Sequence, residues 1–492
     1  MGLQVDRSDF AEDDFRRFRH RLDLSLKALR ARLEGGFLDH DECSLGAELE
    51  LVIADAGGRP LPLNRVLSEQ TRDPRWQLEI DRFNLEYNLT PVAARGTPFS
   101  VLRAELDRVV AQARALAAPH GALLHMVGIL PTLRASDLSS GAMTDLPRYR
   151  ALSEGIRRLR RKPFQIDIAG DDRLELLADD VTFEGANNSF QLHMRTRASR
   201  FAVLYNALQL ATAPALALST NSPLLFGKRL WEETRIALFK QSVDTRVVDE
   251  TRPRNPPRVS FGTGWVRHSA SEIFAECVAL YPPLIPLLSE QDPVECVAQG
   301  CAPDLVELRL HTGTVWRWNR PVYDPADGGH LRIEARTLPA GPTSIDMLAS
   351  AAYLLGLAQG LTSQLWRLIE AMPFGYAGWN FYRAAQYGLD AQLVWPGADG
   401  GMRETSARSL AAELLPLAHR GLLEMGVSEG ESAALLDIVG GRLDRGMTGA
   451  RWQRERFRAL SAAMPLDAAL TQLVTEYEQL SRKGDPVHTW SP

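Results

Sequence analysis

Cysteine and histidine are scarce in this sequence of 492 residues, which contains four cysteines and ten histidines. The cysteines, Cys43, Cys277, Cys296 and Cys301, form no C-x-x-C pair, and no histidine stands near them at the spacing of a zinc site. We therefore expect free thiols in a reducing cytoplasm. The spacing leaves open whether Cys296 and Cys301 reach each other.

Long apolar runs and an excess of positive charge are also missing. No apolar stretch is long and uninterrupted enough to span a bilayer, and the first residues lack a basic segment followed by an apolar run, so neither a membrane span nor a signal peptide is expected. The formal net charge of −5 gives no broad electrostatic reason to bind nucleic acid or an anionic membrane. The chain has no G-x-x-x-x-G-K-[ST] loop and no kinase glycine loop, so metal ions and a sheet would have to hold any nucleotide.

The most informative stretch that is present is 45–51. Its leucines and Ala47 alternate with Gly46, Glu48 and Glu50, which predicts a strand with one face on a core. Two glutamates two residues apart repel each other unless a cation lies between them, and Mg²⁺ prefers carboxylate oxygens. For this strand alone, a solvated sheet face is an equally good interpretation.

The same alternation returns in three further segments, 83–90, 188–195 and 330–336. Their polar positions carry mostly ionisable groups: Glu86, with Glu79 upstream; Gln191, His193 and Arg195; Arg332, Glu334 and Arg336. If the four strands share one curved antiparallel sheet, these polar faces converge on a concave surface and the apolar faces pack under helices. Carboxylates there could hold divalent ions and a nucleoside triphosphate, while arginines grip phosphate and a substrate carboxylate.

Three of these residues have other interpretations. Asp81 could serve in place of Glu79, which lies outside the cleanest alternating run. His193 could be a core histidine with a satisfied hydrogen bond, although its neighbours favour a polar face. Arg332 could simply pair with acids across the sheet.

The rest of the chain is mostly helical in pattern. Helices are predicted over 8–33, with Ser8 as the cap, and over 97–118, 200–217, 270–279 and 342–372, with four amphipathic helices at 407–425, 431–445, 448–462 and 466–482. Residues 122–130 read as a short strand and 225–265 as irregular. The arginine-rich segment 146–162 is better explained as a solvated helix face than as a phosphate site, because the whole chain is acidic.

No internal repeat or low-complexity linker divides the sequence. We therefore expect one α+β catalytic domain with a helical part packed on it. The predicted division is an N-terminal helix at 1–40, a catalytic core at 41–345 and a helical C-terminal part at 346–492.

Five motifs follow one another in the predicted core. They are Gly46-Ala47-Glu48-Leu49-Glu50; Glu79 with Glu86 through Pro91; Gln191-Leu192-His193; Ser219 through Pro223 with Gly227 and Arg235; and Gly313 through Trp316 with Arg320-Pro321 and Glu334-Ala335-Arg336. In this order they resemble the glutamate–cysteine ligase family, in the group that includes the bacterial carboxylate–amine ligases. Met447 through Ala450 is loosely similar as well.

The resemblance implies a glutamine-synthetase-like fold, a funnel-shaped antiparallel sheet with helices outside. It implies an ATP-dependent ligase that joins glutamate, or a related carboxylate, to an amine such as cysteine through an acyl phosphate. The metal ligands for Mg²⁺ or Mn²⁺ would be Glu48, Glu50, Glu79, Glu86, His193 and Glu334. Gln191, His193 and Arg332 would contact the nucleotide, and Arg336, Arg320 and Arg235 would act on phosphate and substrate carboxylate.

The chain also departs from the family pattern. It is longer than compact members through 140–185, 245–310 and the C-terminal helices, and Asn319 stands where those members tend to carry an acid. Such insertions usually reshape the entrance and the acceptor pocket, so the amine is left open, as is the oligomeric state. A metal-dependent hydrolase and a non-catalytic nucleotide- or amino-acid-binding protein remain as alternatives.

Overall fold

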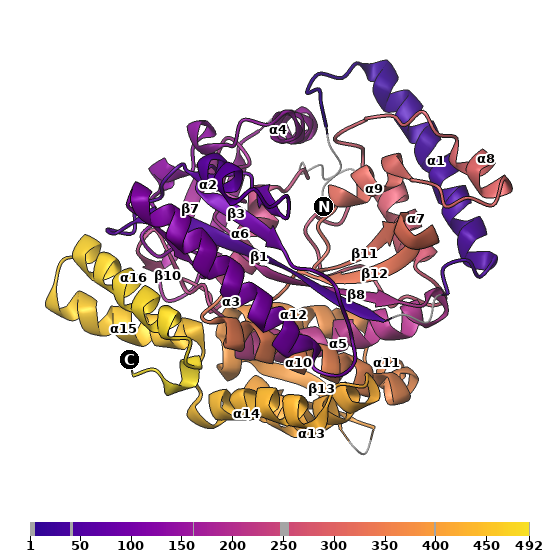
Figure 1. The fold of residues 1–492 in the computed structure, drawn as a ribbon. Helices are drawn as coiled ribbons and strands as arrows, with labels where there is room; N and C mark the ends of the chain where they lie inside the picture. The colour runs from indigo at the N-terminus through magenta and orange to yellow at the C-terminus, as the bar shows by residue number, and fades with distance from the viewer. Residues whose placement is uncertain (1–4, 40–42, 161, 247–254, 398–399, 492) are drawn as a thin grey trace.

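A curved antiparallel sheet of eight strands lies at the centre of the protein, with helices below and around it (Figure 1). The computed structural model describes residues 5–39, 43–160, 162–246, 255–397 and 400–491. The strands of this sheet are β1 (Ser44–Asp55), β2 (Trp76–Leu78), β3 (Asn84–Asn88), β4 (Val92–Ala93), β5 (Ala122–His125), β8 (Phe190–Thr196), β11 (Asn319–Asp324) and β12 (His330–Ala335). Their order is β11-β12-β8-β1-β3-β2, and β4 and β5 also pair with β1. The predicted α+β fold class is confirmed.

The four strands predicted from alternation are direct neighbours in this sheet, in the order β12-β8-β1-β3. Glu48 lies opposite Gln191 and Glu50 opposite Glu86. His193 lies opposite Glu334. Because directly opposed residues project on the same side of a sheet, the predicted polar positions share one face.

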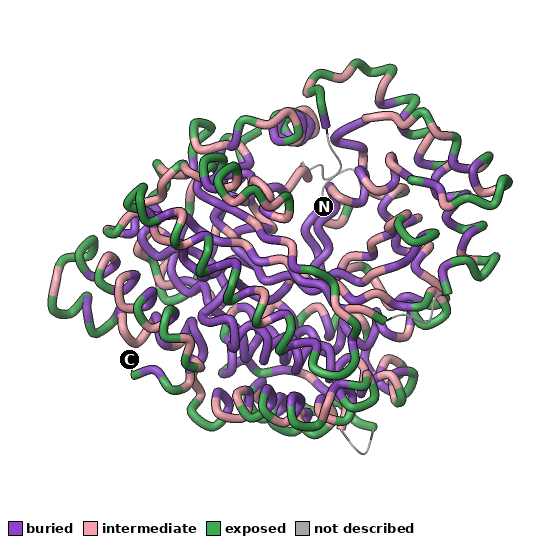
Figure 2. Tube along the Cα trace, in the orientation of Figure 1, coloured by how far each residue is buried: buried purple, intermediate pink, exposed green. Residues whose placement is uncertain are grey.

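The other face of the sheet packs on two apolar helices, α5 (Phe201–Ser219) and α10 (Ser344–Leu361), which contact each other. A further layer, α13 (Ala407–Glu424) and α14 (Glu429–Arg445), covers α10 on its outer side (Figure 1). Figure 2 shows this central layer as almost wholly buried. Being enclosed on all sides, α5 and α10 need no polar stripe.

The expectation that no segment is long and apolar enough to span a membrane was wrong. Ala198–Ser219 and Ser344–Ala371 both meet that test by length and composition. Their apolar windows are 94% and 89% buried inside the fold, which is how the core helices of a large globular domain look.

Among the described residues, twelve further α-helices surround this core. They are α1 (Glu12–Glu34), α2 (Asn64–Thr71), α3 (Pro98–Ala117), α4 (Pro147–Arg160), α6 (Thr234–Ser242), α7 (Ser271–Leu280), α8 (Pro293–Ala298), α9 (Val306–Gly313), α11 (Leu365–Ala371), α12 (Phe374–Tyr387), α15 (Gly449–Ala463) and α16 (Leu466–Lys483). Three two-stranded ribbons complete the fold: β6 (Phe164–Ala169) with β7 (Arg173–Ala178), β9 (Leu224–Leu225) with β10 (Lys228–Arg229), and β13 (Gln392–Pro396) with β14 (Met402–Ser406). The N-terminal helix α1 packs against α7, α8 and α9.

Several predicted boundaries were wrong. The first helix begins at Glu12 and not at Ser8, because the Asp14 carboxylate accepts the Ala11 N–H at 2.9 Å and satisfies the helix start locally. The strand at 122–130 ends at His125, and the segment 225–265 is not irregular throughout, since it contains α6. Part of that segment lies outside the described residues. The arginine-rich helix is α4, and Arg148, Arg150 and Arg157 on it are exposed, as predicted.

The prediction of free thiols was wrong for one pair. Cys296 and Cys301 form a disulfide, with their Cα atoms 5.2 Å apart. The chain turns back on itself after α8, and the Cys301 N–H donates to the Cys296 carbonyl at 3.0 Å. Cys43 and Cys277 are free thiols.

Candidate active site

Three ionisable groups from adjacent strands meet in the middle of the polar face. The Nε2 atom of His193 lies 3.0 Å from Oε1 of Glu48. One candidate ligand atom from each of Glu48, His193 and Glu334 lies within 4.8 Å of the other two. The structure therefore brings together, on β1, β8 and β12, three of the residues predicted to hold a metal.

Glu334 is fully buried and bound by two arginines. Arg320, opposite it on β11, donates from Nε to Oε2 at 2.8 Å and from Nη2 to Oε1 at 3.0 Å. Arg336 donates from Nη1 to the same Oε1 atom. Burial alone would raise the pKa of Glu334, but the two guanidinium groups and His193 outweigh it and hold the pKa well below its usual range. The side chain is therefore ionised at neutral pH.

A hydrogen-bonded chain extends from Arg336 toward the next glutamate on β1. Arg336 Nη1 donates to Gln191 Oε1 at 2.6 Å, and Gln191 Nε2 donates to Glu50 Oε1 at 2.9 Å. The other oxygen of Glu50 accepts the Ser189 N–H at 2.6 Å. Gln191 thus connects Glu50 with the arginine-bound Glu334, and its amide fixes the position of both neighbours.

The carboxylates do not share one charge state. Burial raises the pKa of Glu48, but the nearby His193 reverses this and lowers the pKa to about 2. For Glu86, burial together with Glu48 and Glu50 raises the pKa to about 8. Burial also raises the pKa of Glu50, against the opposing effect of Arg336. At the β1–β3 end of the face, burial and neighbouring acids therefore favour the neutral form of Glu86, whereas Glu48 is ionised.

Glu79 and Asp81 were left as alternatives, and they lie in different surroundings. Gln77 opposes Glu86, so Glu79, two residues further on, continues on the polar face. Burial, Glu86 and Glu50 raise the pKa of Glu79 well above its usual value. Asp81 is fully buried beside Gly185 and has no hydrogen-bond partner for its carboxylate among the described residues. Glu79 is the better candidate because it lies among the acids of the face.

Glu184 is an acid of this cluster that the sequence analysis did not select. Burial and Glu50 raise its pKa to about 7, although Arg336 and Arg148 oppose the shift. It lies in the turn-rich segment before β8 and belongs to no alternating strand. No periodic signal could therefore have identified it.

The other predicted arginines take different positions. Arg235, at the start of α6, is 2% exposed and donates to Glu233 Oε1 at 3.0 Å and to the Thr337 carbonyl at 2.7 Å. It therefore supports the backbone next to Arg336. Arg332, on the polar face, lies 3.0 Å from Asp324 through Nη1.

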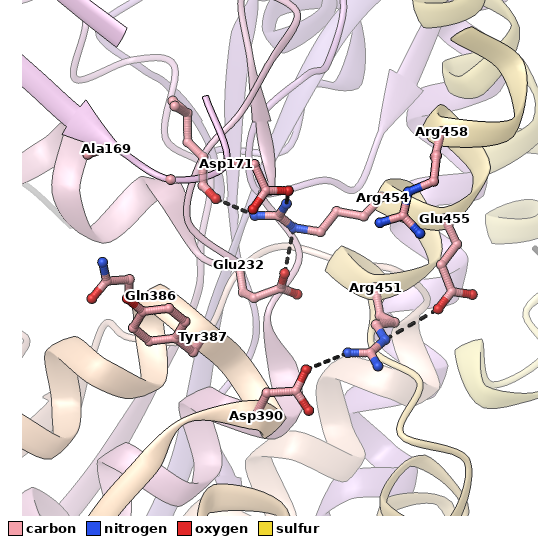
Figure 3. Close-up of a pocket in the computed structure, with 12 residues that line it drawn as sticks. Ala169, Asp171, Glu232, Gln386, Tyr387, Asp390, Arg451, Arg454, Glu455 and Arg458 are labelled. Atoms are coloured by element: carbon pink, nitrogen blue, oxygen red, sulfur yellow. Dashed lines mark hydrogen bonds and ion pairs between the residues drawn. The ribbon is translucent and has the colours of Figure 1, made fainter. Parts of the chain in front are cut away.

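A separate cavity of about 600 Å³ lies away from this face, between α15 and the β6–β7 turn (Figure 3). Two of the arginines that line it are paired, Arg454 with Asp171 and Glu232, and Arg451 with Asp390 (Figure 3). Because acids already bind these two arginines, and the candidate metal group lies on the sheet face, we assign the chemistry to that face and not to this cavity.

Comparison with solved structures gives similar folds at low sequence identity. The glutamate–cysteine ligase of Francisella tularensis, solved in complex with AMP, has a TM-score of 0.53 and 10% identity, and the match covers 92% of this chain and 96% of that one. A bifunctional glutathione synthetase from Pasteurella multocida has a TM-score of 0.48 and 12% identity, with 93% and 55% of the two chains covered. The ligase PafA, in complex with the ubiquitin-like protein Pup, has a TM-score of 0.40 and 10% identity, with 88% and 71% covered.

Sequence comparison gives two results. The search of curated proteins found no match. The sequence profile of glutamate–cysteine ligase family 2 matches residues 44–476, a span that contains every strand and arginine of the polar face described above. This chain therefore belongs to glutamate–cysteine ligase family 2.

Proposed function

We propose that this protein is an ATP-dependent ligase that joins the γ-carboxylate of glutamate, or a related carboxylate, to an amine. The observation that carries the proposal is the Glu48–His193–Glu334 group with Arg320 and Arg336 beside it. Ligases that form amides through an acyl phosphate need a metal-held triphosphate and cationic groups at the transferring phosphoryl. The family and the fold support a ligase at this general level.

The donor set suits a divalent cation such as Mg²⁺ or Mn²⁺. Hard cations of this kind take carboxylate oxygens, which Glu48 and Glu334 offer, and a neutral imidazole is a common metal ligand that His193 could add. Each carboxylate oxygen has two lone pairs, so Glu334 keeps acceptor capacity beside its arginine bonds. Glu50, Glu79 and Glu86 form a cluster of buried acids beside this group, and a bound cation would favour their ionised forms. When bound, the cation would neutralise phosphate oxygens and polarise the transferring phosphoryl group.

The protein's own residues then act by position and charge. Arg336 is held by Gln191 and Glu334, so its guanidinium presents fixed donors toward the face. Such preorganised donors stabilise the charge that develops when a substrate carboxylate attacks the terminal phosphate. An amine would displace phosphate from the resulting acyl phosphate and form the amide. No protein nucleophile is required, and the four cysteines have no part in this mechanism.

Membership of glutamate–cysteine ligase family 2 supports glutamate as the carboxylate substrate. Cysteine is one candidate acceptor among several amines. The similar Francisella enzyme was solved with AMP, which supports a nucleotide as co-substrate here. A cytoplasmic enzyme acting on small molecules, with no nucleic acid or membrane partner, is consistent with the chain's net charge of −5.

The proposal is tested by incubating the protein with ATP, Mg²⁺, glutamate and a panel of amino acids and amines. Mass detection should show an amide product with equimolar ADP and phosphate. Accumulation of AMP and pyrophosphate would contradict the acyl-phosphate route. Turnover of an amide without nucleotide would identify a hydrolase, and ATP binding without any product would identify a binding protein.

Arg336→Lys should separate a catalytic from a structural arginine. Lysine keeps the charge but loses the planar fork of donors, so we expect kcat to fall about a hundredfold, on the order of 3 kcal/mol, with a much smaller change in KM for ATP. The melting temperature should stay nearly unchanged. Arg442→Lys is the control, because the Arg442 side chain is also buried, at 2% exposed against 13% for Arg336, but pairs with Asp346 between α14 and α10, away from the polar face. It should lower the melting temperature and leave kcat intact; the same pattern for Arg336→Lys would make Arg336 structural.

The stability of the metal-free protein should depend on pH through Glu86. Its folded pKa of about 8 lies above the ordinary value of 4.5, so the folded state binds this proton more tightly. The stabilisation is complete below the ordinary pKa and is lost as pH rises through the folded value. In the presence of chelator, Glu86→Gln should therefore change the melting temperature little near pH 4, raise it increasingly as the pH rises above 4.5, and raise it most near pH 9.

The control for this experiment is Glu404→Gln, at an exposed position on β14. It should leave the pH dependence of melting as in the wild type. Added Mg²⁺ should stabilise the wild type more at the higher pH, and Glu86→Gln should reduce that gain. If both variants follow the wild-type melting curve at every pH, the buried charge assigned to Glu86 is wrong.

A further inference from the structure

The cavity between α15 and the β6–β7 turn has charged groups of both signs on facing walls (Figure 3). Arg451, Arg454 and Arg458 lie three and four residues apart on α15, so they project from one side of that helix. Three carboxylates reach the cavity from other segments of the chain. They belong to Asp171 in the β6–β7 turn, Glu232 before α6 and Asp390 after α12.

Two of the three arginines share four carboxylates between them. The ion pairs are Arg454 with Asp171 and Glu232, at 3.0 and 2.5 Å, and Arg451 with Asp390 and Glu455, at 2.7 and 3.3 Å. Burial raises the pKa of Glu232 from its usual value. Even with that acid protonated, three carboxylates remain for two guanidinium groups. This part of the cavity is therefore negative on balance.

Arg458, one turn further along α15, is in the opposite situation. It lines the cavity, is exposed, and forms no ion pair among the described residues (Figure 3). An exposed arginine alone needs no ligand. Here, however, it lies one helical turn from an arginine that already holds two acids. The cavity therefore has a negative end at Arg454 and a positive end at Arg458.

These two ends limit the charge of a ligand. A simple anion could bind Arg458 but would be repelled by the surplus carboxylates, and a simple cation would meet the reverse. A zwitterion carries both charges and can pair each with the end of opposite sign.

The distance between the two ends limits the length of that ligand. Four residues of α-helix rise about 6 Å, which separates Arg454 from Arg458 along the axis of α15. The amine nitrogen and the carboxyl carbon of a single amino acid are only about 2.5 Å apart, whereas two extended residues span up to about 7 Å. The cavity volume of about 600 Å³ leaves room for a ligand of the longer kind.

We propose that this cavity binds a zwitterion of about dipeptide length. Its ammonium group would lie among the carboxylates that hold Arg454, and its carboxylate would accept hydrogen bonds from Arg458. The site is separate from the sheet face, and its binding groups include no metal ligand of that face. The inference therefore goes beyond the proposed ligase reaction and does not depend on it.

Calorimetric titration with alanyl-alanine at pH 7, without nucleotide or metal, tests the proposed ligand class. Three comparison ligands each lack one feature: alanine is too short, N-acetyl-alanyl-alanine has no ammonium, and alanyl-alanine amide has no carboxylate. Each should bind at least about tenfold more weakly, because it loses a hydrogen bond between charged groups. No binding of alanyl-alanine, or equal binding of all four ligands, would overturn the proposal.

Arg458→Gln tests where the dipeptide binds. This variant should weaken the binding of alanyl-alanine about tenfold, because the amide keeps hydrogen-bond donors but loses the charge. Arg420→Gln is the matched control, since Arg420 is also an exposed helical arginine without an ion pair among the described residues, but on α13 and outside the cavity. It should bind the dipeptide as the wild type does.

Asp171→Asn tests the negative end of the cavity. It should weaken the binding of alanyl-alanine but not that of N-acetyl-alanyl-alanine, which has no ammonium to lose. Weaker binding of both ligands would mean that the cavity has changed shape, and would contradict the assigned role of Asp171. Melting curves show whether each variant is folded.

The proposed site and the proposed ligase function fail in different ways. If Arg458→Gln and Asp171→Asn both bind alanyl-alanine as the wild type does, the dipeptide binds elsewhere and the cavity assignment is overturned. That result leaves the ligase function intact, because the titrations contain neither ATP nor Mg²⁺. Absence of amide formation with ATP would in turn leave the cavity site intact.

Discussion

The ionised carboxylate of Glu334, buried between Arg320 and Arg336, is the interaction on which the rest of the site depends. A buried carboxylate without these partners would be protonated, and two buried guanidinium groups without the carboxylate would repel each other. The hydrogen bonds fix β11 against β12 and hold Arg336 where Gln191 can connect it to Glu50. One pairing therefore sets both the geometry and the charge of the face.

The charges along the face are arranged in order. At the β1–β3 end, Glu50, Glu79, Glu86 and Glu184 have raised pKa values because burial and mutual repulsion oppose their ionisation. At the other end, Arg195 and Arg332 lie directly opposite each other on β8 and β12. The Glu48–His193–Glu334 group lies between these two regions. A cation bound at this group would favour the ionised forms of the neighbouring acids.

The period-two alternation predicted the fold class and the polar face correctly. Glu48, Glu50, Glu86, His193 and Glu334 could be placed on one side of their strands because side chains alternate strictly in a strand. Their adjacency could not be deduced, since alternation says nothing about which strand pairs with which. The roles of these residues stay predictions, although the structure brings Glu48, His193 and Glu334 together as a candidate metal group.

What the sequence did not reveal depends on contacts between distant segments or on irregular backbone. The opposition of Arg195 and Arg332 follows from the β8–β12 register, and the Arg235–Thr337 bond from the packing of α6. Glu184 lies in turns that have no period. The Cys296–Cys301 disulfide depends on how the chain leaves α8, which residue spacing alone does not determine.

The central claim is that a substrate carboxylate attacks the terminal phosphate of ATP on this face. The most direct test uses glutamate labelled with ¹⁸O in its γ-carboxylate, together with ATP, Mg²⁺ and whichever amine is accepted. The mechanism predicts one ¹⁸O atom in the released phosphate for each amide formed, because that oxygen bridges the acyl phosphate and leaves with phosphorus. Amide formation with unlabelled phosphate, or with the label in AMP, would contradict the account.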